Sequence, residues 1–183
     1  MPRLALIALI LLLAGCSAAT RYIINVNVLS FIPQNQRSLN IPTGYYLVVY
    51  PSLEGQQVPI PISLDILERG QLNIQGSLTN TGAILMTGNY EVRIAPESDT
   101  NLNDNTGGDV GLGSTSFNVA PGGTQAVNTN IQLSATQNSA AFNILKSGSF
   151  RIALRVETNS NGGRFDLSSA RISLTGRPFA LVK

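Results

Sequence analysis

Alternation of apolar and polar residues dominates most of the chain. In the longest such stretches, apolar residues recur at alternate positions and Asn, Gln, Ser, Arg or Glu stand between them. A period of two predicts β-strands that bury one face and expose the other to water. It favours antiparallel sheets, because parallel strands buried on both sides give continuous apolar runs. The predicted strands lie within 22–28, 71–78, 90–94, 127–133, 150–157 and 170–174.

Other segments depart from this alternation. Tyr45–Tyr50 is apolar on both faces, which predicts a central strand, and 117–119 and 179–182 are shorter candidate strands. Ala140–Lys146 is the one stretch that favours a short helix. The segment 58–61 contains Pro59 and Pro61 and is not expected in a central strand, because a proline cannot donate a ladder hydrogen bond.

Turn signals rich in Gly, Pro and Asn separate the predicted strands. Many short strands at this spacing predict a sandwich or a barrel, so we expect a single all-β domain over 21–183. Residues 21–67 either add strands to the main sheet or pack separately from a core at 68–183. The expected turns lie at 42–44, 54–55, 69–70, 80–82, 88–89, 121–123, 147–148 and 161–163.

The order of features from Leu72 onward resembles the Ig-like domains of bacterial surface adhesins. Leu72–Gly82 is similar to their strand followed by an Asn-x-Gly turn, and Tyr90–Ile94 resembles the next strand. Val119–Gly123, between two strand patterns, also resembles them. The Cys…Trp…Cys core of antibody domains is absent. The resemblance implies an antiparallel Ig-like β-sandwich.

The leader has a different pattern. Arg3 precedes an unbroken apolar run at 4–13, which is shorter than the ~20 residues of a membrane-spanning helix and fits a secretory signal. The residues Leu13-Ala14-Gly15-Cys16 then resemble the lipobox of bacterial lipoproteins. That resemblance implies that a signal helix at 1–15 is removed and that Cys16 carries diacylglycerol and an N-acyl chain. Residues 16–20 would then be a lipidated tether.

The same resemblance implies a location in the cell envelope. Ser17 follows the cysteine, and by family analogy a serine there favours the outer membrane where the organism has one. Acyl chains contribute about 0.8 kcal/mol per buried CH₂, so two or three of them hold a protein stably on a bilayer. The alternative is an ordinary signal peptide followed by an incidental cysteine.

Composition excludes several classes of function. The chain of 183 residues has a formal net charge of +2, only 12% charged residues and no histidine. Without an imidazole base, Ser-His-Asp and Cys-His catalysis are excluded. The arginines are scattered and do not form the clustered basic face that nucleic-acid binding requires. We therefore expect a protein that is not an enzyme, has no cofactor beyond its lipid, and does not bind nucleic acid.

The polar segment at 97–109 is a candidate calcium loop, because calcium takes six to eight oxygen ligands from such residues. The segment departs from an EF-hand loop at Asp104, where glycine is needed, and at Val110, where a glutamate is needed. The alternative is a solvated polar loop. The candidate ligands are Asp99, Asn101, Asn103, Asp104 and Asp109.

Three further sets of residues are candidates for a site. The carboxylates of Glu91 and Glu157 lie on predicted wet faces, where they suit either a glycosidase pair or salt bridges to Arg93 or Arg155. Carboxylates also occur at Asp65, Glu68 and Asp166. Alternation places Tyr46 and Tyr50 on one strand face, as a binding surface or as core. The third set is the amide-rich strand faces, which include Asn25, Asn27, Asn73, Gln75, Asn128, Asn130 and Gln132.

The function that these patterns favour is a lipid-anchored envelope protein with a non-catalytic β-sandwich. Its partners would be the membrane, through the lipid, and another envelope protein, through sheet edges and loops. One alternative is a carbohydrate- or calcium-dependent binding module. Another is an envelope hydrolase based on two carboxylates.

Overall fold

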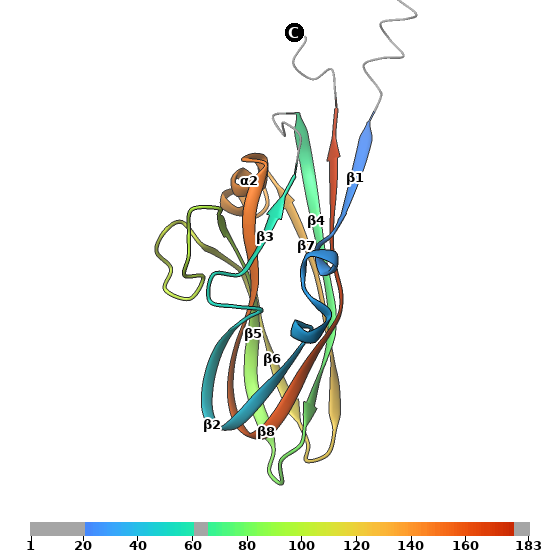
Figure 1. Ribbon diagram of the computed structural model, residues 1–183. Helices are drawn as coiled ribbons and strands as arrows, with labels where there is room; N and C mark the ends of the chain where they lie inside the picture. The colour runs from blue at the N-terminus through green and yellow to red at the C-terminus, as the bar shows by residue number, and fades with distance from the viewer. Residues whose placement is uncertain (1–20, 61–65, 178–183) are drawn as a thin grey trace, which may run out of the picture.

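The computed structural model describes residues 21–60 and 66–177, and eight strands make up most of this part (Figure 1). The predicted leader, Cys16, Pro61, Asp65 and the candidate strand at 179–182 lie outside the described residues. The strands are β1 Tyr22–Asn27, β2 Ser38–Tyr50, β3 Gln56–Pro59, β4 Leu67–Asn80, β5 Met86–Pro96, β6 Val110–Val119, β7 Thr124–Ser134 and β8 Ser149–Gly176. The helical segments are η1 Val28–Phe31, η2 Gln34–Gln36 and α2 Ser139–Lys146.

One strand, β8, organises the sheet. It is 28 residues long and pairs antiparallel with β5 and β4 on one side and with β3, β2 and β1 on the other. The strand order is β6-β5-β8-β4-β7. Near Gly162, β8 bends back on itself, so its two halves lie in opposite layers (Figure 1). The fold class predicted from the sequence, an antiparallel β-sandwich, is confirmed.

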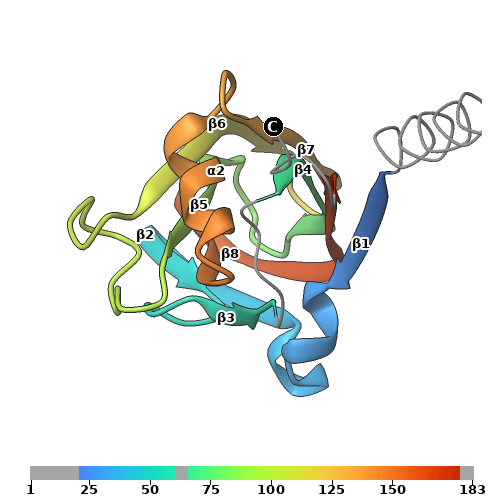
Figure 2. The same cartoon turned by 90° about the horizontal axis from the view of Figure 1, so that it is seen from above.

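The two layers enclose a single large apolar core. Viewed along the long axis, the strands surround this core as a flattened barrel (Figure 2). One layer contains β6, β5 and the first half of β8, and the other contains β7, β4 and the second half. The inward residues of the predicted alternation supply the core, with Phe117, Phe150 and Phe165 among its largest fully buried side chains. The strands at 21–60 pair with β8 and so belong to the same sheet.

Several predicted turns were wrong, because the chain bends at them without leaving the ladder. Pro42–Gly44 lies inside β2 and 161–163 lies inside β8, and both are at the lower end of Figure 1. Gly44 and Gly162 have φ values of 113° and 107°, which favour glycine and allow a strand to change layers. The two strands predicted at 150–157 and 170–174 are therefore one strand.

Two other predicted turns, at 69–70 and 88–89, lie inside β4 and β5. The glycines are needed there for close packing: a Cβ on Gly70 would meet Leu145, and one on Gly88 would meet Phe117. Strand β2 was predicted as central, and this was also wrong, because among the described residues it pairs with β8 alone. Its inner side chains pack on the core, whereas Tyr45 and Leu47 on its outer face stay exposed.

The two ends of the domain differ. At the upper end in Figure 1, β1 starts beside the end of β8, with Tyr22 opposite Gly176, and α2 packs nearby. Helix α2 confirms the helix predicted at 140–146, and β3, which contains Pro59, is an edge strand as expected. Within residues 21–60 and 66–177, the helices are too short or too polar to span a bilayer.

Candidate functional site

Polar side chains form a broad surface on the outside of the layer β1–β8–β4–β7. We call it the amide face and define it by Asn25, Asn27, Gln71, Asn73, Gln75, Asn128, Asn130, Gln132, Ser169, Arg171 and Ser173. The strand register aligns these residues in rows: Asn25, Ser173, Gln71 and Gln132 stand opposite one another across four strands. Four segments distant in sequence thus present neutral amides and hydroxyls side by side.

The amide face is hydrogen-bonded across its strands and is hollowed. Ser173 Oγ donates to Asn25 Oδ1 at 2.7 Å, and Gln71 Nε2 donates to Asn130 Oδ1 at 2.9 Å. Two adjoining hollows of about 510 and 490 Å³ share Gln71 and Ser173. The predicted polar strand faces therefore form one surface, and the residues that define it include no carboxylate.

The opposite layer carries the paired carboxylates. Arg155 Nη1 lies 3.9 Å from Glu91 Oε2 and 3.7 Å from Glu157 Oε2, so one guanidinium stands between them. A glycosidase needs the space between its two carboxylates for the sugar and a water molecule. The salt bridges expected as the alternative are confirmed. Two further carboxylates of the predicted set are also paired, Glu68 with Arg177 at 2.7 Å and Asp166 with Arg164 at 2.7 Å.

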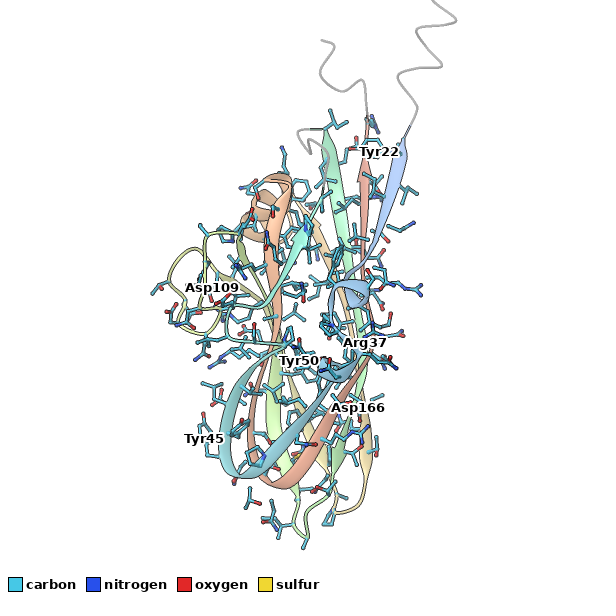
Figure 3. The ribbon with its side chains drawn as sticks, in the orientation of Figure 1. Tyr22, Arg37, Tyr45, Tyr50, Asp109 and Asp166 are labelled. Carbon is cyan, nitrogen blue, oxygen red and sulfur yellow. The ribbon has the colours of Figure 1, made fainter. Side chains whose placement is uncertain are left out.

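Tyr46 and Tyr50 take the second of their two predicted roles, as core residues, and do not form an exposed binding surface. Tyr50 is only 4% exposed, packs edge-on against Phe165 with ring centroids 5.3 Å apart, and donates its hydroxyl to Gln36 O. Tyr46 is half-buried and packs against the core. Both point inward because even-numbered residues of this part of β2 face the core. Tyr45 is 69% exposed and donates to Glu157 (Figure 3).

The candidate calcium loop is held by a buried arginine. Arg93 is 3% exposed, donates Nη1 to Glu91 at 3.0 Å and Nη2 to Asn105 at 2.6 Å, and also pairs with Asp109. Alternation had placed Arg93 on a wet strand face. It is buried because the loop folds over that face, which a strand pattern cannot show.

The other predicted ligands of this loop make local contacts. Asp99 accepts from the backbone N–H of Asn101 at 2.9 Å, and Asp104 accepts from Asn101 Nδ2 at 2.7 Å. Asn103 instead accepts from Arg155 Nε at 2.9 Å, which ties the loop to β8. Among the residues that the structure describes, no cluster of three or more Asp, Glu, Cys or His side chains is arranged to hold a metal ion.

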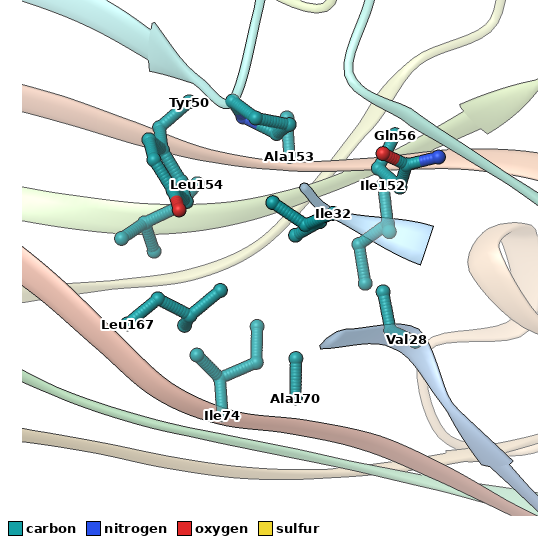
Figure 4. Close-up of a pocket in the computed structure, with 11 residues that line it drawn as sticks. Val28, Ile32, Tyr50, Gln56, Ile74, Ile152, Ala153, Leu154, Leu167 and Ala170 are labelled. Atoms are coloured by element: carbon teal, nitrogen blue, oxygen red, sulfur yellow. The ribbon is translucent and has the colours of Figure 1, made fainter. Parts of the chain in front are cut away.

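A small apolar cavity lies where η1 covers the gap between the layers. Its volume is about 30 Å³, and Val28, Ile32, Ile74 and Leu167 are among its walls (Figure 4). Space of this size accommodates about one water molecule, and the walls offer it little hydrogen bonding. The cavity is a packing gap rather than a ligand site.

Comparisons with known proteins find resemblance in three-dimensional structure alone. No family model matches the chain, and no curated protein matches it. A structure of infectious bursal disease virus (Gx strain) aligns with 89% of this chain at 7% identity and a TM-score of 0.44. The T=1 particles derived from infectious bursal virus align with 88% at 6% identity and a TM-score of 0.46.

A third similar structure is the C-terminal CBM6 domain of LamC, a marine laminarinase from Zobellia galactanivorans. It aligns with 82% of this chain at 13% identity and a TM-score of 0.33, and 98% of that domain is covered. The chain spans about a third of the viral chains, 35% and 33% of their lengths. At these identities and TM-scores, the similarities assign no function to the chain.

Proposed function

We propose that this chain is an exported lipoprotein, anchored by diacylglycerol on Cys16, whose β-sandwich is a non-catalytic recognition domain in the cell envelope. The lipobox-like residues Leu13–Cys16 suggest the anchor. The partner is another envelope protein, and the amide face is the surface that contacts it. Ser17 favours the outer membrane by the analogy stated above.

The observation that carries the proposal is the short distance in sequence between Cys16 and the folded domain. Strand β1 begins at Tyr22 and pairs at once with Gly176, so five residues separate the proposed anchor from the sheet. A lipid at Cys16 would hold the upper end of the domain at the bilayer. With ~3.3 Å per residue, β4 alone would carry the opposite end roughly 45 Å outward.

The amide face suits recognition because amides and hydroxyls with several donors and acceptors each line its exposed strand faces. Interfaces between proteins that associate reversibly are about as polar as the remaining surface and rely on hydrogen bonds and bridging waters. The acidic groups of the other layer, by contrast, are engaged by Arg93 and Arg155. The amide face also starts at β1, so an anchored domain would present it close to the membrane.

The anchor is tested by metabolic labelling with radioactive palmitate in a bacterial host. The wild-type chain is expected to incorporate label and to fractionate with membranes, whereas Cys16→Ser loses both properties. Ser17→Ala is the matched control and keeps the label. Blocking lipoprotein signal peptidase should cause the longer precursor to accumulate. An unlabelled wild-type chain that is processed and released would contradict the proposed anchor.

The amide face is tested by crosslinking in the native host and mass spectrometry of captured proteins. A single envelope protein in stoichiometric yield is expected with the wild-type chain. Its yield should fall with Asn73→Arg, which adds a long charged side chain at the centre of the face. Asn40→Arg, on an exposed part of β2, is the control. Equal capture by both variants would exclude the amide face as the contact.

A neutral glycan is a second candidate ligand for the same face. The observation that favours it is the pair of adjoining hollows, whose lining of amides, hydroxyls and the side chains of Arg69 and Arg171 can hydrogen-bond to sugar hydroxyl groups. Affinity electrophoresis of the chain in gels containing purified neutral envelope polysaccharide separates the candidates. Retardation that Asn73→Arg abolishes would favour the glycan, whereas unchanged mobility would leave the protein partner.

A further inference from the structure

Strands β6 and β7 are the two ends of the sheet and lie next to each other without pairing. In the described residues, β6 pairs with β5 alone and β7 pairs with β4 alone. They are joined by the turn at 120–123, and the backbone N–H of Asn118 on β6 is satisfied by the side chain of Gln125, at 3.3 Å. The barrel therefore has a seam here, where two rows of backbone groups are unpaired.

The seam opens into a groove that has an apolar floor and mostly polar walls. Its volume is about 300 Å³, and it is lined from β5, β6 and β7. Tyr90, Val92, Leu112 and Ile131 are core residues that reach its surface. The hydroxyl oxygen of Thr129, which also lines the groove, is buried and has no hydrogen-bond partner. Apolar floor and unpaired polar groups together indicate a surface that a further strand would complete.

The edges of this seam lack two of the usual protections against pairing, charged residues and prolines. Exposed edge strands normally carry charged residues, prolines or strong bulges that prevent association with another sheet. Neither β6 nor β7 contains a charged residue or a proline, and β6 exposes only small residues from Gly113 to Ser116. The edge on the other side, made by β2 and β3, has Pro42 and Pro59. The β6–β7 seam therefore has neither charged residues nor prolines on its two strands, and β6 carries a bulge between Gly111 and Ser114, where its pairing with β5 shifts register.

We propose that the seam is a dimer interface, in which β6 of one copy of this chain pairs with β7 of a second copy and β7 pairs with β6. The geometry favours a second copy because β6 and β7 run in opposite directions, side by side. A two-fold axis parallel to the strands brings β6 opposite the second copy's β7, and both resulting pairs are antiparallel. Such an interface is isologous and closes on itself, as in most soluble dimers.

The charge of β6 and β7 and the direction of the two-fold axis are both compatible with a second copy of the chain as the partner. Both strands are neutral, so the same surface can meet itself without like-charge repulsion. An axis along the strands also keeps the first residues of both β1 strands at the same end of the dimer. Two copies so joined can be held on one membrane, yet the interface does not depend on the anchor and can be tested separately from it.

Cysteine crosslinking in membranes tests the dimer. Two differently tagged full-length chains, one with Ser114→Cys on β6 and one with Asn128→Cys on β7, are co-expressed and treated with a short bis-maleimide. A crosslinked species containing both tags is expected. The wild-type chain, in which Cys16 is the single cysteine, sets the background. Asn40→Cys on β2, paired with either variant, is the matched control.

A charge on the seam should separate the copies. Ser116→Lys, at an exposed position of β6, is expected to lower the crosslinked fraction about tenfold, because a lysine on an edge strand opposes pairing. Asn40→Lys should leave it unchanged, and circular dichroism should show that both variants fold. Sedimentation of the detergent-solubilised wild-type chain should give twice the monomer mass, and Ser116→Lys should give the monomer.

The dimer proposal is overturned if the wild-type chain sediments as a monomer and the mixed-tag crosslink stays at background. It is also overturned if Asn40→Cys crosslinks as strongly as the seam cysteines, or if Ser116→Lys changes nothing. Palmitate labelling reports on the anchor alone. A labelled chain that fails the crosslinking test would refute the dimer and leave the proposed lipoprotein intact.

Discussion

Asn80 Nδ2 donates a hydrogen bond to the carbonyl oxygen of Val119, 2.9 Å away, and so joins the end of β4 to the end of β6. The same amide donates to Ile84 O at 2.7 Å, and Asn80 Oδ1 accepts from the N–H of Gly82 at 2.9 Å. The backbone of Asn80 exchanges hydrogen bonds with Gly122 and Gly123, both at 3.0 Å. This fully buried residue therefore fastens both turns at the lower end of the sandwich.

We predict that Asn80→Ala lowers the free energy of unfolding by about 3 kcal/mol, because it removes the three side-chain hydrogen bonds to Ile84, Val119 and Gly82, of which the one to Val119 O is buried. Urea unfolding followed by circular dichroism measures the loss. Asn128→Ala, on the exposed amide face, is the control and should stay within about 0.5 kcal/mol of the wild type. Equal stability of the two variants would show that the turns hold without Asn80.

Arg93→Met should destabilise the domain by about 3–5 kcal/mol, since it leaves the buried carboxylate of Asp109 without its partner. The double variant Arg93→Met/Asp109→Leu is expected to recover most of this loss, because it removes both charges. Arg164→Met, which breaks an exposed pair with Asp166, should change stability by about 0–1 kcal/mol. Thermal unfolding of the three variants measures their stabilities. A double variant that is no more stable than Arg93→Met would contradict the prediction.

Gly162→Ala and Gly44→Ala should each cost about 1–3 kcal/mol, because both glycines have positive φ values at the bends between layers. At Gly44 a Cβ would meet no atom within 4 Å, so its cost would be backbone strain alone. Thr43→Ala, next to that bend, is the control. Chemical denaturation measures all three, and a neutral Gly44→Ala would show that β2 can bend without a glycine.

Stability should fall above pH 10 on account of Tyr50. Burial, with a smaller contribution from Asp166, raises the pKa of Tyr50 to about 12 against the opposing effect of Arg37. The folded-state pKa thus exceeds the unfolded value near 10.0, so the stabilisation is fully present below pH 10 and is lost as the pH rises toward 12. Tyr50→Phe lacks this pH dependence. At pH 7 its free energy of unfolding should be about 1 kcal/mol below that of the wild type, because a hydrogen bond is lost, and this difference should shrink with rising pH. A deficit constant from pH 7 to 12 would contradict this assignment.

The positions of the strands could be predicted because a half-buried strand has apolar and polar residues that alternate within its own sequence. Val127 and Ile131 on β7 face the core, and Asn128 and Asn130 between them face water, as alternation requires. The amide face followed from the same pattern. The arrangement of the face could not be predicted, because the order β1–β8–β4–β7 depends on pairings between residues that are far apart in the sequence, such as Tyr22 with Gly176 and Arg69 with Ser134.

The structure differs from the sequence prediction where tertiary contacts override the local pattern of the chain. Asn161–Gly163 has the composition of a turn, and whether it ends a strand or bends one depends on β2 and β4 pairing across it. Arg93 looks exposed in its strand and is buried by a loop that folds back over it. Neither outcome can be decided from neighbours along the chain.

The length of β8 also constrains when the protein can fold. Five strands, β1 to β5, find their partner in β8, which is the last strand of the described chain. Ribosomes add about 5–20 residues per second, so the earlier strands wait many seconds for their partner. Contacts this distant in sequence also make folding slow. Until β8 is made, β1, β2 and β3 have no partner among the described strands, so the domain stays incomplete during synthesis, and an incomplete domain suits the export that we propose.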